Sequence, residues 1–165
     1  MKKTYYSDAK TDALVHRIIQ KLFVDDFKPD YIVGLTRGGL VPAIKLSHYL
    51  NVPLETLKVS LRDGGECESN CWMAEDAYDG KKILIVDDIN DSGATLQWIK
   101  DDWSLSAYRD DPKWQDIWHQ NVKFAVLVDN EASSFGNVDY VGHSINKVEN
   151  PEWIVFPWEK WWVKA

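Results

Sequence analysis

Cysteine is scarce in this sequence. Its two cysteines, Cys67 and Cys71, are spaced C-x-x-x-C in a polar stretch that contains no histidine. A redox pair or a zinc site needs closer pairing and further ligands, so the spacing favours two reduced thiols in a loop. The four histidines are scattered along the chain and form no motif by spacing. They are more typical of helix or surface residues than of metal ligands.

Long apolar runs and an excess of positive charge are also missing. No apolar run approaches the roughly 20 residues that cross a bilayer, and the start Met1-Lys2-Lys3 leads into Thr4 and Tyr5 instead of an apolar signal core. We therefore expect a cytoplasmic protein without membrane contact. The formal charge of −7 and the pI near 5.0 argue against sequence-independent binding of nucleic acid. An anionic ligand must then be bound by a local group of hydrogen-bond donors or positive charges.

What is present is typical of one soluble domain. Hydrophobic residues make up 45% of the 165 residues and are spread evenly, which excludes a disordered chain. We find no internal repeat, no low-complexity tract and no linker rich in proline or serine. The sequence predicts a single domain over residues 1–165.

The expected helices and strands alternate. Ser7 can cap a helix in which one stripe at helical spacing is apolar: Leu14, Val15, Ile18, Ile19, Leu22 and Phe23. Further on, the pattern predicts strands at 31–35, 54–60, 82–86 and 122–128, and helices at 41–50 and 94–100. This order indicates an α/β domain with a mostly parallel central sheet flanked by helices, whose ligands bind outside the carboxyl ends of the strands.

Two segments interrupt the alternation. Residues 62–79 are polar and lack a sustained period, which predicts a long mobile loop. Residues 103–121 contain Trp114 and Trp118, four apart after Pro112, which predicts one face of a short helix. We expect a small helical insertion that packs on the domain or on another subunit. A base-stacking surface is less favoured, because acidic residues surround the aromatic ones.

One segment carries most of the chemistry. Ser92 to Thr95 place hydroxyls and a glycine at a helix N-terminus, where backbone N–H groups can bind a phosphate. Asp87, Asp88 and Asp91, just upstream, would repel the same anion unless they face another part of the ligand. A ligand with a phosphate at one end and a ribose diol beside it resolves the conflict, and a divalent metal could share the acids. An acidic turn with a plain helix cap explains the pattern poorly, and no P-loop or dinucleotide-binding motif is present.

The segment from Ile83 to Leu96 resembles the phosphoribosyl pyrophosphate (PRPP) motif of type I phosphoribosyltransferases. Residues 36–42 (TRGGLVP) and 153–159 (WIVFPWE) resemble the xanthine/guanine and hypoxanthine branch of that family. The resemblance extends from about residue 30 to 160 and leaves out 103–121. It implies the type I phosphoribosyltransferase fold, with a mobile loop and a small C-terminal hood.

The resemblance also implies roles for individual residues in binding PRPP. The 5′-phosphate would lie on five residues, namely Asp91, Ser92, Gly93, Ala94 and Thr95. Asp87 and Asp88 would hold the ribose hydroxyls, with Asp88 also near Mg²⁺. Arg37 and the backbone of Gly38 would hold the departing pyrophosphate, and the peptide bond between them can be cis in the family.

For the base, the resemblance implies a segment at about 129–160. Trp153 would stack on a purine and the main chain of Ile154 would read its edge, while Asp91 would act as the acid/base group near N7. Related enzymes place a lysine against the 6-oxo group after the strand that ends here at Val128. This chain reads Asp129-Asn130-Glu131 instead. Asn130 has a donor and an acceptor and could substitute without a positive charge, so the preferred base stays open.

The function implied is transfer of the phosphoribosyl group from PRPP to a 6-oxopurine, with Mg²⁺ stabilising the released pyrophosphate, by a homodimer or homotetramer. Closure of the loop over 62–79 would exclude water. Arg62 in that loop is equally compatible with a contact to pyrophosphate and with an ordinary surface position. The alternatives are a non-catalytic PRPP-sensing regulator on the same fold and a transferase for a different base.

Overall fold

A computed structural model describes residues 1–61 and 65–163. Its centre is a five-stranded sheet in the order β3-β2-β4-β5-β6, in which every neighbouring pair is parallel. The strands are β2 (Tyr31–Thr36), β3 (Leu54–Lys58), β4 (Ile83–Asn90), β5 (Val122–Asn130) and β6 (Tyr140–Ile145). The predicted α/β class and parallel sheet are confirmed. Within the described ranges, no helix has the length and apolar character needed to span a bilayer.

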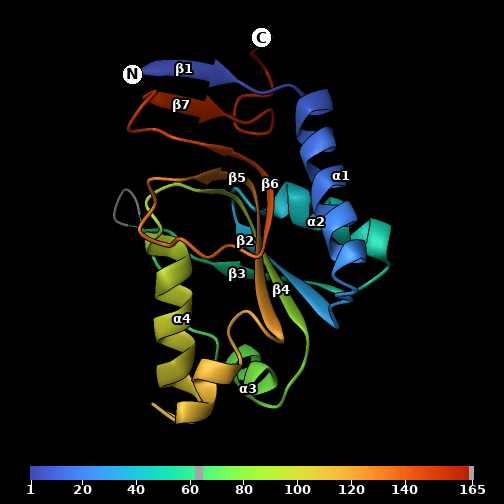
Figure 1. Ribbon diagram of the computed structural model, residues 1–165, viewed down its shortest axis with the longest axis vertical. Helices are drawn as coiled ribbons and strands as arrows, with labels where there is room; N and C mark the ends of the chain where they lie inside the picture. The colour runs from blue at the N-terminus through green and yellow to red at the C-terminus, as the bar shows by residue number, and fades with distance from the viewer. Residues whose placement is uncertain (62–64, 164–165) are drawn as a thin grey trace.

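Helices cover both faces of this sheet (Figure 1). The helices α1 (Asp8–Val24) and α2 (Leu40–Leu50) lie on one face, and α3 (Cys71–Tyr78) and α4 (Ala94–Ser106) on the other. Residues of β4 alternate between the two cores: Ile83 and Ile85 pack on the α3/α4 side, and Leu84 and Val86 on the α1/α2 side. Since both faces are covered, the strand is apolar without a break, as parallel strands usually are.

The first helix follows the sequence closely until its last turn. The Ser7 hydroxyl accepts a hydrogen bond from the backbone N–H of Lys10 at 3.1 Å, which caps the helix as predicted. The predicted apolar stripe is buried, with one exception. Phe23 is 64% exposed and contacts Tyr49 of α2 edge to face.

The two ends of the chain together form a small second sheet. Strand β1 (Lys2–Tyr5) pairs in parallel with β7 (Glu152–Val155), with Lys3 opposite Trp153 and Thr4 opposite Ile154. We call this pair, with the residues up to Lys160, the hood; it lies at the top of Figure 1. None of the strands β1, β6 and β7 is predicted from the sequence. The hood therefore places Trp153 and Ile154 against the rest of the fold through a contact between distant parts of the chain.

Tyr6 fastens the hood to the central sheet. Its backbone N–H donates to the Val155 carbonyl at 2.9 Å, and its hydroxyl is hydrogen-bonded to Nε2 of His143 on β6 at 2.8 Å. Burial, with the negative charge of Glu152, raises the pKa of Tyr6 to about 12. Burial also lowers the pKa of His143 below its ordinary value, helped by the nearby positive charges of Lys10 and Arg17. Both groups are therefore neutral at pH 7.

The loop predicted over 62–79 is wrong for its second half. Residues 71–78 form α3, whose side chains Met73, Ala74 and Ala77 are fully buried against the sheet. Asn70 caps this helix by accepting a hydrogen bond from the Met73 N–H at 3.0 Å. The helix is too short for an apolar period to stand out, so the cap was its main sequence signal. Arg62 lies outside the described residues.

Both cysteines are free thiols, as predicted. Cys67 lies in the stretch between β3 and α3, where it forms an isolated bridge with Val59. Cys71 is the first residue of α3, so only Cys67 lies in a loop as predicted.

The tryptophan-rich insertion packs on its own domain. Helix α4 extends to Ser106, beyond its predicted end, and buries Trp103. Trp114 belongs to a short 3₁₀ helix (η1, Pro112–Asp116), which ends before Trp118. The two residues therefore do not share one helix, contrary to the prediction. Their rings nevertheless stack at 5.6 Å, and both are buried.

Candidate active site

A cleft of about 660 Å³ lies between the carboxyl ends of the parallel strands and the hood. Residues after β2 and β3, the end of β4, the start of α4, the connection from β6 to β7, and the hood all line it. The predicted site residues that meet there are Arg37, Gly38, Asp87, Asp88, Asp91, Ser92, Gly93, Ala94, Thr95, Trp153 and Ile154. A volume of this size is ordinary for a small-molecule site. The structure thus brings together two distant motifs and the C-terminal segment, and leaves out only Asn130.

The acidic part of the cleft is built into β4. The strand continues through Asp87 and Asp88 to Asn90, paired with β5, instead of ending at Val86 as predicted. Each carboxylate is oriented locally: Asp87 accepts from the backbone N–H of Asp88 at 2.9 Å, and Asp88 accepts from that of Ile89 at 2.8 Å. Acidic residues are rare in strands, which explains why the pattern placed the strand end too early.

The start of α4 has the backbone geometry expected of an anion-binding turn. Gly93 precedes the helix with φ +93°, a conformation that favours glycine, and the Ser92 hydroxyl accepts from the Ala94 N–H at 3.3 Å. The first-turn N–H groups of a helix have no partner within it, so they and the helix dipole favour an anion. A Cβ at Gly93 would lie 2.5 Å from the backbone nitrogen of Phe135. The turn is therefore packed closely against the segment after β5.

The Arg37 turn lies against the acidic strand end. A Cβ added at Gly38 would collide with the carboxylate of Asp88, so only glycine allows this approach. The non-proline cis peptide bond of the turn joins Thr36 and Arg37. The resemblance placed it one bond later, between Arg37 and Gly38, and that expectation is wrong. The close approach puts the guanidinium-bearing turn and the carboxylates in the same part of the cleft.

Asn130 does not line the cleft, contrary to its predicted contact with the base. It is 7% exposed, and its side-chain amide donates to the Asp91 carbonyl at 3.0 Å. Its oxygen accepts from the backbone N–H groups of Ala132 and Lys147, at 3.2 and 3.1 Å. Both ends of the amide are thus engaged with the protein. The neighbouring Asp129 is half-buried, which raises the pKa of its carboxyl, and it accepts from Asn90 at 2.8 Å.

Lys147 is a cleft residue to which the sequence analysis gave no role. Its Nζ lies 2.9 Å from Oδ1 of Asp91 and 5.2 Å from the centroid of the Trp153 ring. The lysine side chain is 14% exposed. Its only sequence signal was its position within the expected base-binding segment at about 129–160, and β6 itself was not predicted. The Lys147 ammonium therefore contacts both Asp91, the predicted acid/base residue, and Trp153, the predicted stacking residue.

The hood supplies the apolar wall of the cleft. Trp153 is 37% exposed, whereas Ile154 and Phe156 are buried. Trp158, which belongs to the 153–159 segment but was given no role in the site, stacks on Phe156 with the ring planes 8° apart. A partly exposed indole above buried neighbours offers a flat face to a planar ligand.

Comparison with known proteins agrees with this geometry. The model of the phosphoribosyl transferase domain family matches residues 3–161. The chain belongs to this family. A xanthine-guanine phosphoribosyltransferase from Cereibacter sphaeroides is 32% identical over 133 residues, which are 78% of this chain and 68% of that protein.

Other known phosphoribosyltransferases cover nearly the whole chain. A hypoxanthine-guanine phosphoribosyltransferase from Schizosaccharomyces pombe is 23% identical over 185 residues, covering 95% and 89% of the two chains. The solved purine phosphoribosyltransferase from Pyrococcus horikoshii has a TM-score of 0.67 and 29% identity, over 96% and 95% of the two chains. The expected type I phosphoribosyltransferase fold and the enzyme class are confirmed.

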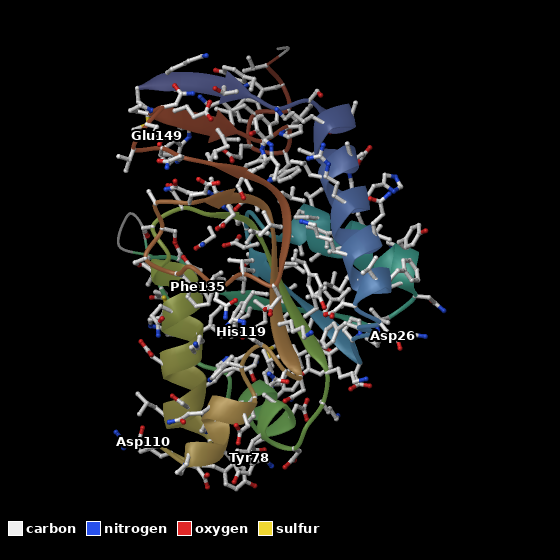
Figure 2. All side chains as sticks on the ribbon, in the orientation of Figure 1. Asp26, Tyr78, Asp110, His119, Phe135 and Glu149 are labelled. Atoms are coloured by element: carbon white, nitrogen blue, oxygen red, sulfur yellow. The ribbon has the colours of Figure 1, made fainter. Side chains whose placement is uncertain are left out.

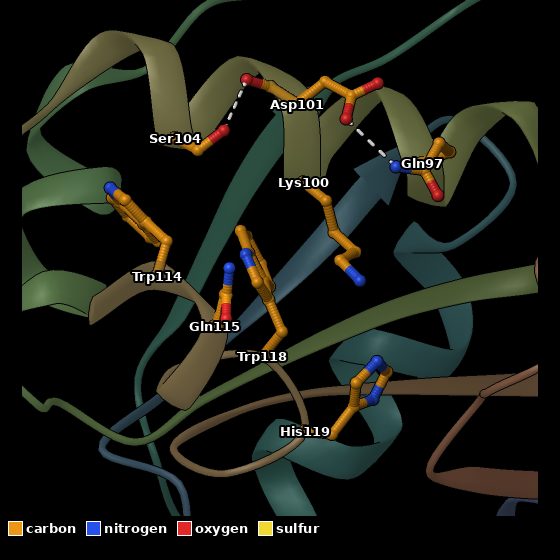
Figure 3. Close-up of a pocket in the computed structure, with 8 residues that line it drawn as sticks. All are labelled: Gln97, Lys100, Asp101, Ser104, Trp114, Gln115, Trp118 and His119. Carbon is orange, nitrogen blue, oxygen red and sulfur yellow. Dashed lines mark hydrogen bonds between the residues drawn. The ribbon is translucent and has the colours of Figure 1, made fainter. Parts of the chain in front are cut away.

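The phosphoribosyltransferase has a second groove, of about 380 Å³, between α4 and the insertion (Figure 3). It is lined by Lys100 and other polar residues of α4 and by Trp114, Trp118 and His119. Lys100 Nζ lies 5.9 Å from the centroid of the Trp118 ring, and His119 is bonded to Asp139 at 3.0 Å. No residue of the PRPP motif lines this groove. The candidate chemistry therefore belongs to the cleft under the hood.

Proposed function

We propose that this phosphoribosyltransferase transfers the 5-phosphoribosyl group of PRPP to hypoxanthine, guanine or xanthine and releases pyrophosphate, in nucleotide salvage. One observation carries the proposal: a single cleft joins an acidic strand end, a helix N-terminus and an aromatic hood. These three parts match the diol, the phosphate and the base of the two substrates. The names of the relatives, which act on xanthine, guanine and hypoxanthine, support the same substrate class.

At the PRPP end of the cleft, different residues would bind the phosphate and the ribose hydroxyls. The first-turn N–H groups of α4, with Ser92 and Thr95, would bind the 5′-phosphate. The carboxylates of Asp87 and Asp88 would accept hydrogen bonds from the ribose hydroxyls. Because Asp87 and Asp88 lie on β4 and the α4 N-terminus comes after it, the phosphate would be held by backbone N–H dipoles, away from these two carboxylates.

The residues around Gly38 fit a magnesium site that the substrate completes. The carboxylate of Asp88 lies against the Gly38 turn, where Arg37 would hold the pyrophosphate. Among residues 1–61 and 65–163, no cluster of three or more metal-ligating side chains occurs. Mg²⁺ commonly uses one or two carboxylates and takes its remaining ligands from phosphates and water. Asp88, with Asp87, would hold the ion, which when bound neutralises charge on the leaving pyrophosphate.

The base end of the cleft would activate the nucleophile. A purine stacked on Trp153, with the main chain of Ile154 at its edge, would direct N7 toward Asp91. As N9 forms its bond to C1 of the ribose, the C1–O bond breaks and its electron pair leaves with pyrophosphate. The proton on N7 passes to the carboxylate of Asp91, which prevents positive charge from building up on the base. The hood covers the reacting carbon and limits access of water.

We also propose that the enzyme works in the cytoplasm as a homodimer or homotetramer. Composition and the surface near the C-terminus support this proposal. Trp161 and Trp162 near the C-terminus are 77% and 65% exposed, which is typical of residues that a second subunit covers.

The test of the proposed function is a panel of bases. The protein is incubated with PRPP, Mg²⁺ and each of hypoxanthine, guanine, xanthine, adenine and uracil, and released pyrophosphate is measured. We expect release with at least one 6-oxopurine and formation of an equal amount of nucleoside monophosphate. PRPP binding without release in the presence of any base would instead identify a PRPP-sensing regulator.

A further inference from the structure

Lys147 occupies a defined place in the base end of the cleft. It belongs to the connection from β6 to β7, whose Glu149 is labelled beside the hood in Figure 2. Its Nζ bridges the carboxylate of Asp91, at 2.9 Å, and the ring of Trp153, at 5.2 Å from the centroid. With the lysine side chain 14% and that of Asp91 22% exposed, this ion pair is partly withdrawn from solvent. It is therefore screened less than a surface pair.

The backbone of Lys147 is fixed by the residue that was expected to bind the base. The Asn130 side chain accepts from the Lys147 N–H at 3.1 Å and donates to the Asp91 carbonyl at 3.0 Å. One buried amide thus ties the main chains of Lys147 and Asp91 together. Just before Lys147, Asn146 closes a turn by accepting from the N–H groups of Val148 and Glu149, at 3.0 and 3.2 Å. The position of the lysine is built into the fold.

The chemistry of a purine edge shows what such a pair can recognise. N7 and the substituent at position 6 are neighbours on one edge of the ring. A 6-oxopurine presents an acceptor at position 6, and a 6-aminopurine presents a donor. The lysine ammonium has three donors and no acceptor. If Asp91 faces N7, the ammonium beside it faces position 6, where it matches an oxygen and is mismatched to an amino group.

We infer that Lys147 is the residue that selects 6-oxopurines over 6-aminopurines, and that Asn130 positions it against Asp91. The inference rests on the proposed function, because it names the base-recognising residue of that reaction. No lysine or arginine stands at the end of β5 or directly after it, because Asp129, Asn130 and Glu131 stand there, and Asp129 and Asn130 make contacts within the protein. Lys147 brings a positive charge to this end of the cleft from the next connection. That charge is also suited to an anionic base such as ionised xanthine.

The test compares Lys147→Met with wild type on hypoxanthine, guanine and adenine. Loss of a charge-assisted hydrogen bond should lower kcat/KM for the two oxopurines roughly 10- to 100-fold, mainly through KM. For adenine, kcat/KM should stay within about 3-fold or rise, since a mismatched donor has been removed. The matched control is Lys100→Met in the second groove, which should leave all three values unchanged. Lys147→Arg, which keeps the charge, should retain most of the preference for oxopurines.

The possible outcomes separate the inference from the proposed function. Calorimetric binding of PRPP and thermal unfolding first establish that each variant is folded. If the folded Lys147→Met enzyme keeps the wild-type ratio of hypoxanthine to adenine activity, the inference is overturned and the proposed function stands. If Lys147→Met does not fold, Lys147→Gln, which also removes the charge, decides in its place: a hypoxanthine-to-adenine ratio well below that of wild type supports the inference, and the wild-type ratio overturns it. Failure of the wild-type enzyme on all purines removes both.

Discussion

Replacing Asp91 with asparagine should lower kcat about 100- to 10,000-fold, because the amide cannot take the proton from N7 as N9 attacks. Asparagine preserves the shape of the side chain and the backbone contact to Asn130, so the turn should stay in place. PRPP affinity should therefore remain within a few-fold of wild type. Steady-state kinetics with the preferred base, together with calorimetric titration of PRPP, measures the two effects separately.

Asp101→Asn is the matched control for this substitution. Asp101 lies on α4 and lines the second groove, where it accepts a hydrogen bond from Gln97 at 3.0 Å (Figure 3). The Asp101→Asn substitution makes the same chemical change away from the cleft and should leave kcat unaltered. A kcat of Asp91→Asn close to that of wild type would remove the acid/base role of Asp91.

Gly93→Ala should destabilise the protein by about 2–5 kcal/mol and weaken PRPP binding at least about 10-fold. Two causes add. At φ +93° a side chain strains the backbone, and the new Cβ would lie 2.5 Å from the Phe135 nitrogen and 2.8 Å from its Cβ. Because Phe135 is buried and backbone cannot rotate away, the start of α4 must move. Urea unfolding gives the free energy of unfolding, and calorimetry gives the PRPP affinity.

Gly80→Ala separates these two causes. Gly80 has the same φ of +93°, but a Cβ there would meet nothing within 4 Å. This variant should lose only the strain contribution, about 1–2 kcal/mol, and should bind PRPP like wild type. Equal losses of stability and affinity in the two variants would show that the packing of Gly93 against Phe135 does not shape the phosphate cradle.

Local patterns in the sequence predicted much of the fold and of the PRPP end of the cleft. The Ser7 cap, the apolar run of β4 and the hydroxyl-rich turn after it each depend on residues close together in the chain. The carboxyl ends of parallel strands meet at one edge, so Arg37 and Asp88 could be placed in one site before the structure was known.

Contacts between distant segments explain what the sequence did not predict. Strand β1 is short, and its partner β7 lies at the other end of the chain. Lys147 and Asn130 acquire their roles only when the connections after β5 and β6 lie side by side. Polarity made Asn130 a reasonable candidate for the base, but burial and two engaged amide ends give it a structural role. Recognition of a base requires a positive charge at one place in the cleft, and residues from different connections of the fold can supply it.

The most direct test of the central claim is a crystal structure of the protein with PRPP and Mg²⁺. We expect the 5′-phosphate on the backbone N–H groups at the start of α4, the ribose hydroxyls on Asp87 and Asp88, and the pyrophosphate beside Arg37. PRPP bound elsewhere, for example in the groove lined by Lys100 and His119, or bound in the cleft with the phosphate away from residues 92–95, would contradict it.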